Sequence, residues 1–415
     1  MCIWQAAPLV QEARQQESAR HAPQLELFDA QGQVVMPAFI DMHAHFRDPG
    51  LTQKEDLESG SRAAAAGGFG TLVLMPNTNP VISSQEAALS NNRRGAEIGL
   101  AELFQSVSIT RDFGGTDISQ LEELDARLVP LITEDGHEVQ DSAVMFQAMQ
   151  IAAKKHIIVS CHCEDPFLAA AARPLRKVAL AELEKGNREE AARLLAQADE
   201  LLRLAEDTAT DRNIRLAAQA GCHLHLCHVS TAQSIDIIRQ AKARGAKVTC
   251  ETAPHYFIYT YEKVLGRDAD YRMNPPLRDE SDRQAVIQGL LDGTIDAIAT
   301  DHAPHSPGEK ADFVSAPNGV VGMETSLAAT LTYMRGLLSL SDIVRLMSQA
   351  PASILGIDGG AVREGAPADF VLVDLNETWL VDPDKLHGRS KNAVFKGETL
   401  TGRVKATYCG GRKVF

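Results

Sequence analysis

Short apolar runs recur along the chain, and each ends in polar or ionisable residues before an Ala-rich helical stretch begins. The eight runs are Phe39–His45, Thr71–Asn77, Leu103–Thr110, Leu128–Asp135, His156–Glu164, Cys222–Ser230, Lys247–His255 and Ile295–His302. Helical stretches such as Glu55–Ala66 and Thr231–Arg244 lie between most of them. Repeated strand–helix units predict a parallel sheet, and eight units over this length predict an α/β fold, a closed TIM-type (β/α)8 barrel.

Residues 1–37 and 358–415 fall outside this rhythm. The first region contains a polar stretch, Gln11–His21, and one strand near Leu25–Val35. The last region alternates like antiparallel strands at Asp369–Leu375, Thr378–Val381 and Gly402–Phe415, with a Gly-Gly turn at Gly410–Gly411. We therefore predict that residues 38–357 form the barrel, and that residues 1–37 and 358–415 together form a small β-sandwich subdomain.

The segment Phe167–Leu204 is rich in Ala, Leu and charged residues at helical spacing. It follows the fifth apolar run without supplying a strand. We predict that it forms an inserted helical hairpin.

The composition is ordinary for a globular protein, with 44% hydrophobic and 23% charged residues among 415. A formal net charge of −14 argues against a nucleic-acid-binding surface, because such a surface needs basic side chains. No apolar run approaches the roughly 18 residues of a membrane span, and no basic residues precede Ile3–Val10 as they would in a signal peptide. We therefore expect a cytoplasmic protein without membrane or nucleic-acid partners, whose seven cysteines are reduced thiols.

The first candidate chemistry lies at the end of the first run, in Asp41-Met42-His43-Ala44-His45. Residues i and i+2 of a strand point to the same side, so His43 and His45 converge in a way that suits one metal ion. The alternative is a pair of packed or surface histidines. Later runs end in four more ionisable residues: Asp135, His162, His228 and Asp301. Because one metal takes about four protein ligands, six nitrogen and oxygen ligands with one shared carboxylate fit two adjacent metals.

Five neighbours of these candidate ligands point away from them if strand alternation holds. They are Cys161, Cys163, His223, His225 and Cys227. We interpret all five as packing or supporting residues rather than as metal ligands.

Seven stretches together resemble dihydroorotases of the bacterial type I class, within the amidohydrolase superfamily. They are FIDMHAHFRDPG at Phe39–Gly50, GGFGTLVLMPNTNP at Gly67–Pro80, CHCED at Cys161–Asp165, HVST at His228–Thr231, ETAPHY at Glu251–Tyr256, MNPPLR at Met273–Arg278 and TDHAPH at Thr300–His305. A His-x-His pair alone belongs to the whole superfamily. The order HFRDPG, MPNT, NPPLR and TDHAPH is much more specific, and the resemblance extends from residue 36 to the C-terminus.

The resemblance implies two zinc ions per subunit. The first would be bound by His43, His45 and Asp301, the second by His162 and His228, and Asp135 would bridge the two. Hydantoinases bridge with a carboxylated lysine instead, whereas the fourth run here ends in Glu134-Asp135-Gly136. In the implied reaction an activated hydroxide attacks the ring carbonyl, and Asp301 delivers the proton to the leaving nitrogen.

The resemblance also implies substrate contacts. Arg47 lies two residues past His45, and its planar guanidinium suits a bidentate grip on a carboxylate. The other implied contacts are His45, Asn77, Asn274 and His305, with the backbone of Asn318 and Gly319. From the residues alone, a salt bridge from Arg47 to Asp48 or Glu55 is the simpler interpretation, and the two asparagines are turn or loop residues.

The implied activity is the reversible cyclisation of N-carbamoyl-L-aspartate to L-dihydroorotate in pyrimidine biosynthesis. One alternative is a hydantoinase- or allantoinase-like cyclic amidase, which predicts a lysine bridge. Another is a non-catalytic dihydroorotase-like partner of aspartate transcarbamoylase, which predicts lost metal ligands. The sequence leaves open a homodimer and an association with aspartate transcarbamoylase. It departs from the family in its short N-terminal segment and in the long Ala-, Glu- and Arg-rich segment after CHCED.

Overall fold

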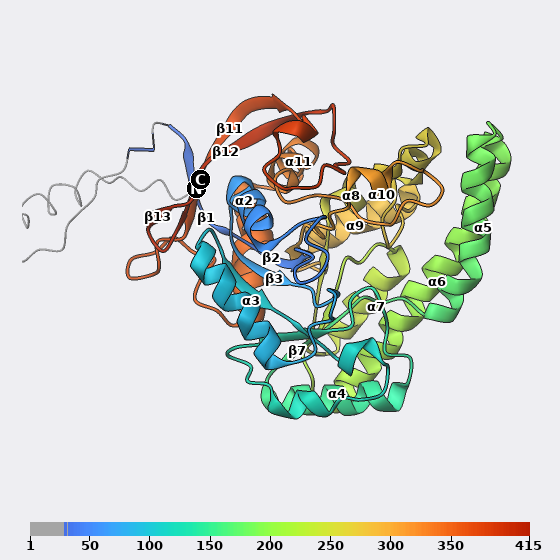
Figure 1. Cartoon of the computed structure of the whole chain (residues 1–415), viewed down its shortest axis with the longest axis horizontal. Helices are drawn as coiled ribbons and strands as arrows, with labels where there is room; N and C mark the ends of the chain where they lie inside the picture. Colours follow the sequence, from blue (N-terminus) through green and yellow to red (C-terminus); the bar gives the residue numbers. More distant parts are fainter. Residues whose placement is uncertain (1–28, 31) are drawn as a thin grey trace, which may run out of the picture.

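Eight parallel strands close into a barrel in the computed structural model, which describes residues 29, 30 and 32–415 (Figure 1). They are β2 (Phe39–Ala44), β3 (Phe69–Leu74), β4 (Glu102–Gln105) continued by β5 (Val107–Ser108), β6 (Leu131–Thr133), β7 (Ile158–Cys161), β8 (Leu224–Leu226), β9 (Val248–Thr252) and β10 (Ala297–Ile298). The strand orders are β2-β3-β4 and β5-β6-β7-β8-β9-β10. A parallel bridge between Ala44 and His302 closes the ring, and the His45 amide donates to the His302 carbonyl over 2.9 Å. The predicted (β/α)8 barrel is confirmed.

Helices surround these strands and follow most of them in sequence. They are α2 (Leu57–Gly67), α3 (Gln85–Ile98), α4 (Ser142–Lys155), α7 (Ala232–Ala243), α8 (Pro254–Ile258), α9 (Glu280–Asp292), α10 (Pro307–Lys310), α11 (Ser326–Tyr333), α12 (Leu340–Val344) and α13 (Ala350–Leu355). Local sequence sets their ends. Before α2 the Asp56 side chain accepts from the Ser59 amide over 2.8 Å, and after it Gly68 adopts a φ of 89°. These are a polar N-cap and a left-handed glycine C-cap.

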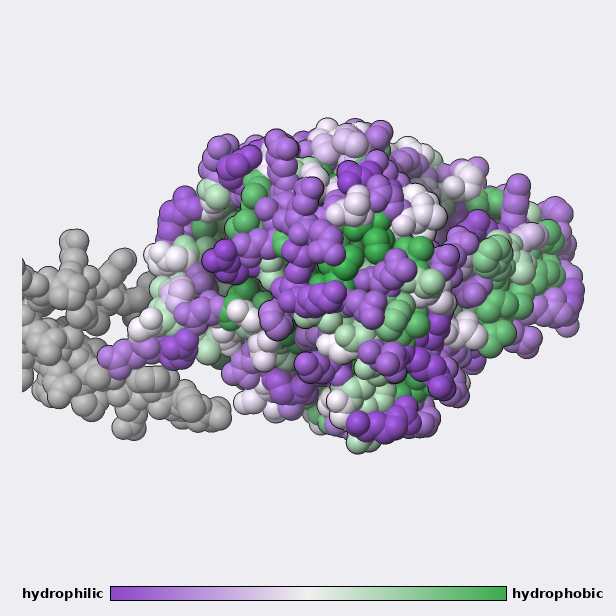
Figure 2. Space-filling model, turned by 90° about the horizontal axis from the view of Figure 1, so that it is seen from below, coloured by the Kyte–Doolittle hydropathy of each residue, from purple (hydrophilic) through white to green (hydrophobic). Residues whose placement is uncertain are grey.

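The predicted helical hairpin is formed by α5 (Pro166–Glu184) and α6 (Arg188–Ala220), which project from one side of the barrel (Figure 1). The second helix continues well past the predicted end at Leu204. The two helices pack on each other through Ala172 and Leu202, and a second cluster joins Leu180 and Leu195 to Val264 and Phe313 outside the hairpin. Phe167 and Val178 of α5 remain exposed, and apolar side chains gather at this end of the molecule, on the right of Figure 2.

A separate antiparallel sheet joins the two ends of the described chain. Its order is β1 (Val34–Pro37), β11 (Phe370–Leu380), β12 (Thr399–Cys409) and β13 (Arg412–Lys413), with the predicted turn at Gly410–Gly411 before β13. The segments Asp369–Leu375 and Thr378–Val381, predicted as two strands, belong to the single strand β11. The pairing register with β12 shifts between Asp374 and Thr378, which explains why the sequence pattern breaks there. The stretches Ile3–Val10 and Gln11–His21 and the start of the strand predicted near Leu25 lie outside the described residues.

No helix among the described residues is long and apolar enough to cross a membrane. Hydrophilic side chains cover most of the face seen in Figure 2, as expected for a chain with a formal net charge of −14. The polar groups that matter for chemistry lie elsewhere, inside the barrel.

Candidate metal and active site

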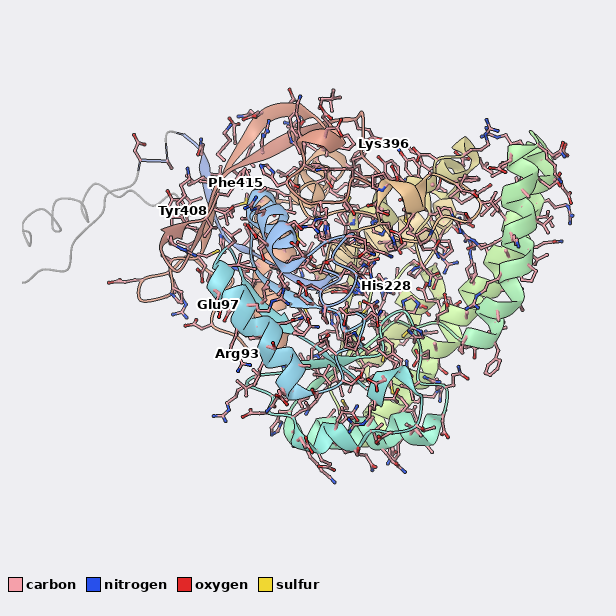
Figure 3. The ribbon with its side chains drawn as sticks, in the orientation of Figure 1. Arg93, Glu97, His228, Lys396, Tyr408 and Phe415 are labelled. Atoms are coloured by element: carbon pink, nitrogen blue, oxygen red, sulfur yellow. The ribbon has the colours of Figure 1, made fainter. Side chains whose placement is uncertain are left out.

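Six ionisable side chains converge where the barrel strands end. They are His43 and His45 at the end of β2, Asp135 after β6, His162 after β7, His228 after β8 and Asp301 after β10. Figure 3 shows His228 near the middle of the barrel. The exposed fractions run from 1% for His43 to 7% for Asp301. Because parallel strands all end at the same rim of a barrel, residues far apart in sequence meet there. All six predicted metal ligands are brought together.

His43, His45, Asp135 and Asp301 surround one point. The Nε2 atom of His43 lies 3.3 Å from Asp135 Oδ1 and 3.6 Å from Asp301 Oδ1. The Nε2 atom of His45 lies 3.5 Å from Asp135 Oδ2 and 3.4 Å from Asp301 Oδ1. Two imidazole nitrogens therefore face two carboxylates across a gap of the size that a cation would fill.

His162 and His228 form a second group beside the first. Their Nδ1 and Nε2 atoms, respectively, lie 2.9 Å apart. His228 Nε2 also lies 4.0 Å from Asp135 Oδ1. Candidate ligand atoms of Asp135, His162 and His228 all lie within 4.8 Å of one another. The two groups share Asp135, which is the arrangement that a bridging carboxylate requires.

Both carboxylates of the site are held in their charged form. Burial would raise the pKa of Asp135, but the charge of His43 holds that pKa well below the ordinary value. Burial would also raise the pKa of Asp301, but its contact with His45 and the charge of His43 lower it. Ionised carboxylates are the form that binds a metal.

The imidazoles fall into two classes. Burial lowers the pKa of His45, and it lowers the pKa of His228 to about 3, so both rings are neutral near pH 7. Burial also opposes charge on His43, but Asp135 outweighs it and raises the pKa of His43 well above the ordinary value. A metal ion at this point would therefore displace a proton from His43.

Three residues of the site have strained backbones. Arg47, His228 and Asp301 have φ angles of 58°, 34° and 46°, in the left-handed region that residues other than glycine rarely adopt. Strain of this kind persists where the surrounding structure enforces it, and it concentrates at functional sites.

Glu251, the fourth residue of β9, was not singled out from the sequence. It is fully buried, and its Oε1 accepts a hydrogen bond from His43 Nδ1 over 3.0 Å. Its other carboxylate oxygen lies 3.1 Å from His225 Nε2. A carboxylate on Nδ1 fixes the tautomer and leaves the Nε2 lone pair of His43 for a metal. The clues in the sequence were the position of Glu251 near the end of the seventh apolar run and at the start of the ETAPHY stretch.

Cys227 lies beside the predicted metal ligand His43, as a supporting residue would. Its ligand atom lies within 4.8 Å of those of His43 and Glu251 rather than on a remote face. The reason is that β8 ends at Leu226, so the alternation no longer applies to Cys227 and His228. Burial raises the pKa of Cys227 to about 11, which keeps the thiol protonated and agrees with a packing role.

The inserted hairpin supports the loop that carries His228. Glu206 of α6 accepts hydrogen bonds from the amides of Ser230 and Thr231 over 2.8 and 3.0 Å. Arg278 Nη2 donates to the same carboxylate over 3.2 Å. Glu206 and Arg278 are each 4% exposed, so this pair ties the hairpin to the site from within.

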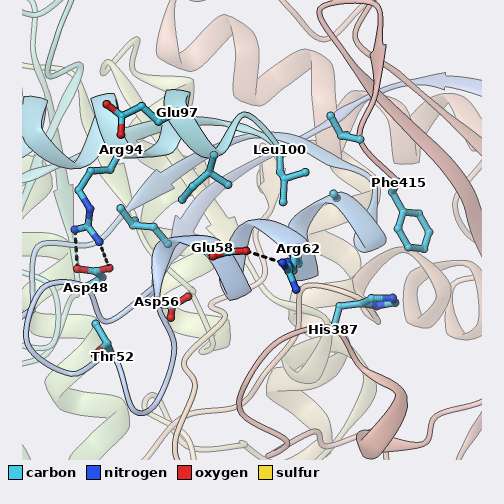
Figure 4. A pocket seen from close by; sticks show the side chains of 14 residues that line it. Asp48, Thr52, Asp56, Glu58, Arg62, Arg94, Glu97, Leu100, His387 and Phe415 are labelled. Atoms are coloured by element: carbon cyan, nitrogen blue, oxygen red, sulfur yellow. Dashed lines mark hydrogen bonds and ion pairs between the residues drawn. The ribbon is translucent and has the colours of Figure 1, made fainter.

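Arg47 has no salt bridge to either acid suggested from the sequence. Asp48 is gripped by Arg94, whose Nη1 and Nη2 donate over 2.9 and 2.7 Å (Figure 4). Glu55 accepts from the backbone amide of Arg389 over 3.0 Å. Arg47 Nε is buried and has no hydrogen-bond partner among the described residues. Its guanidinium is therefore available to an anion.

The two candidate asparagines both touch predicted metal ligands. Asn77 Oδ1 accepts from His45 Nδ1 over 2.9 Å, and Asn77 Nδ2 donates to Asp135 Oδ2 over 3.0 Å. Asn274 Nδ2 lies 3.2 Å from His162 Nε2 and donates to Glu164 over 3.0 Å. Sequence reasoning assigned these amides to substrate only, and the structure adds a role in orienting the ligands.

His305, Asn318 and Gly319 lie together. His305 Nε2 donates to the Asn318 carbonyl over 2.8 Å. Gly319 has a φ of 142°, and a Cβ there would lie 2.7 Å from the Ala303 carbonyl oxygen and 2.9 Å from the His305 ring. Only glycine fits such a close approach. Three of the predicted substrate residues thus form one wall.

Comparisons with known proteins agree with this geometry. The sequence model of the Amidohydrolase family matches residues 34–414. A dihydroorotase of Citrifermentans bemidjiense is 43% identical over 389 residues, covering 93% of this chain and 89% of that protein. A dihydroorotase of Aquifex aeolicus is 37% identical over 394 residues, covering 95% and 90%. The solved structure of an L-hydantoinase from Arthrobacter aurescens aligns with a TM-score of 0.84 at 24% identity, covering 95% of this chain and 88% of that one. At that identity the likeness shows the fold alone.

Proposed function

The chain belongs to the amidohydrolase family and, within it, to the dihydroorotases, and on this premise we propose how its residues open and close the ring. As a dihydroorotase it is a hydrolase of a cyclic amide, interconverting L-dihydroorotate and N-carbamoyl-L-aspartate. The observation that carries the proposal is the approach of two histidines and two aspartates to within 3.6 Å around one point, beside a second histidine pair.

We assign two zinc ions to this site. His43, His45 and Asp301 would hold one, His162 and His228 the other, and Asp135 both. The donor set fits zinc, which takes imidazole nitrogen and carboxylate oxygen. His43 Nε2 supports the fit because it is buried, faces both aspartates and has no hydrogen-bond partner among the described residues. When bound, zinc lowers the pKa of water and polarises a carbonyl.

Asp301 moves the proton in this proposal. Its lowered pKa keeps it ionised near pH 7, so it can accept a proton from the attacking water. As the carbon–nitrogen bond breaks, the same carboxyl group gives that proton to the leaving ring nitrogen. The carboxylic acid formed at the ring carbon then passes its remaining proton to Asp301. In the reverse direction Asp301 therefore starts protonated and gives its proton to the carboxylate oxygen that departs as water, and the proton that the ureido nitrogen loses as the ring closes completes that water.

Substrate is held at both ends. Arg47 binds the carboxylate with its unpartnered guanidinium. Contacts of His305 and of the backbone of Asn318 and Gly319 with that carboxylate stay predictions, because His305 Nε2 donates to the Asn318 carbonyl and the Gly319 amide donates to the Arg272 carbonyl. Burial, with the charges of Arg47 and Lys54, lowers the pKa of His305 to about 3, so it would bind as a neutral ring. Asn274 faces the ring amide. A direct contact of His45 or Asn77 with substrate stays a prediction, because His45 Nδ1 and the Asn77 amide already bind each other.

The test is a zinc assay per chain combined with turnover of L-dihydroorotate and of hydantoin. The proposal requires two zinc ions and a strong preference for L-dihydroorotate. A preference for hydantoin would favour the hydantoinase-like alternative, and metal-free inert protein would favour the non-catalytic one. Retention of all six ligand positions supports catalysis. A homodimer and an association with aspartate transcarbamoylase stay predictions, which sedimentation of the chain with and without that enzyme tests.

A further inference from the structure

Lys310 is a buried lysine that makes no ion pair among the described residues. It ends α10, five residues after His305, and its side chain is 9% exposed. Its Nζ donates to three backbone carbonyls, those of Ala269, Arg272 and Pro317, over 3.0, 3.3 and 2.9 Å. These carbonyls belong to two different loops. One leads into Asn274, and the other carries Asn318 and Gly319.

Arg272 makes a second tie between the same loops. Its Nη1 donates to the carbonyls of Phe313 and Val314 over 2.8 and 2.7 Å. The Gly319 amide returns a hydrogen bond to the Arg272 carbonyl over 2.8 Å. Both cations therefore bind backbone oxygens rather than carboxylates, and they fix the path of the chain at residues 313–319.

We propose that Lys310 is a positioning residue for the substrate, which clamps the loop of Asn318 and Gly319 to the loop of Asn274 and which works only as an ammonium. The inference rests on the proposed function, because it assigns these loops to opposite ends of one substrate. Holding them at a fixed spacing prepares the site for L-dihydroorotate before it binds, which lowers KM rather than raising kcat.

The charge state of Lys310 determines how many hydrogen bonds its Nζ can donate. An ammonium has three N–H donors, one for each of the three carbonyls. A neutral amine has two, and its lone pair would face the third oxygen. Burial lowers the pKa of Lys310 to about 8, within the range where an enzyme is assayed. The charged groups facing it are Asp268 and Asp270, which favour the ammonium, and Arg272 and Lys396, which oppose it.

A substitution at Lys396 can shift the pKa of Lys310 without removing its three hydrogen bonds to backbone carbonyls. Its Nζ lies 2.9 Å from Asp268 Oδ2 and 2.5 Å from Asp270 Oδ2, near the surface (Figure 3). Lys396→Met would remove a repelling charge and leave both aspartates to Lys310. The pKa of Lys310 should then rise, with all three carbonyl bonds intact.

The experiment measures kcat and KM for L-dihydroorotate from neutral to alkaline pH. In the wild type, KM should rise as pH passes about 8, with kcat nearly unchanged. Lys310→Met should raise KM about tenfold at neutral pH, equivalent to about 1.4 kcal/mol. It should also speed amide hydrogen exchange at residues 313–319, while zinc content stays the same. Lys396→Met should keep the neutral-pH KM and shift its rise to higher pH.

A Lys310→Met enzyme with normal KM and normal exchange at residues 313–319 would overturn the clamp. The clamp would also be overturned if KM rose at the same pH in Lys396→Met as in the wild type. This comparison tests the clamp even if Lys310→Met does not fold. A wild-type chain that fails to turn over L-dihydroorotate would instead refute the proposed function, so the two failures are distinguishable.

Discussion

Glu251→Gln should weaken zinc binding while leaving the fold intact. The side chain is fully buried, and its hydrogen bond to His43 Nδ1 is 3.0 Å long. Burial raises the pKa of Glu251, but hydrogen bonds with His225 and His43 bring it down to about 2, so the wild-type side chain carries a full charge. Glutamine keeps the shape and an acceptor oxygen but removes that charge.

The expected loss follows from the kind of bond. A hydrogen bond to a charged group contributes about 1.5–3 kcal/mol, compared with about 1 kcal/mol for a neutral one. Losing the difference, about 0.5–2 kcal/mol, reduces zinc affinity about 2- to 30-fold, at about 1.4 kcal/mol per tenfold. The upper part of this range overlaps the roughly 10–100-fold effects of residues that support metal ligands. Competition with a chromophoric chelator at fixed pH measures the change.

Glu55→Gln is the matched control. Glu55 is also fully buried, but its hydrogen-bond partners are Ser59 and the Arg389 amide rather than a predicted metal ligand. The control should lose stability and keep its zinc affinity. Equal zinc affinity in Glu251→Gln and the wild type would refute the idea that Glu251 prepares His43 for a metal.

Arg47→Lys keeps the charge but loses the planar fork, and kcat/KM for L-dihydroorotate should fall at least 100-fold, about 3 kcal/mol; a normal value would remove Arg47 from substrate binding. His162→Ala should lower zinc per chain and abolish turnover, and full activity with one zinc would contradict the two-metal assignment. Arg278→Met leaves Glu206 buried and unpaired, so urea unfolding should show a loss of about 3 kcal/mol, whereas an unchanged midpoint would mean that the pair contributes nothing. Asp301 must be ionised for hydrolysis and protonated for cyclisation, and its lowered pKa places its titration in the acid range, so within that range the hydrolysis rate should rise with pH and the cyclisation rate fall; parallel profiles would contradict this.

The barrel and its ligand set could be predicted because the relevant information is local. Each strand is a short apolar run, and each candidate ligand follows the end of its run, as Asp135 follows β6. Parallel strands bring those ends to one rim whatever the sequence distance between them. His43 and His45 also share a strand, so their convergence needs no knowledge of the rest of the fold.

The supporting residues could not be predicted, because their partners are distant in sequence or are backbone atoms, which every residue has. Glu251 lies 208 positions from His43. Lys310 binds backbone carbonyls, which any residue supplies. Glu206 is a charged residue just past the predicted end of the hairpin at Leu204, yet it is buried because it binds the loop after His228. A charged residue usually predicts an exposed position, but at these places hydrogen bonds to residues distant in sequence allow it to be buried.

Turnover per bound zinc in Asp301→Asn tests the central claim most directly, namely that one carboxylate both holds metal and carries the proton. Asparagine keeps an oxygen that can touch zinc but cannot accept a proton. We predict that the variant retains part of its zinc and loses nearly all activity in both directions, so that activity per zinc falls at least 100-fold, about 3 kcal/mol. Activity in strict proportion to bound zinc would contradict the claim and leave Asp301 a metal ligand alone.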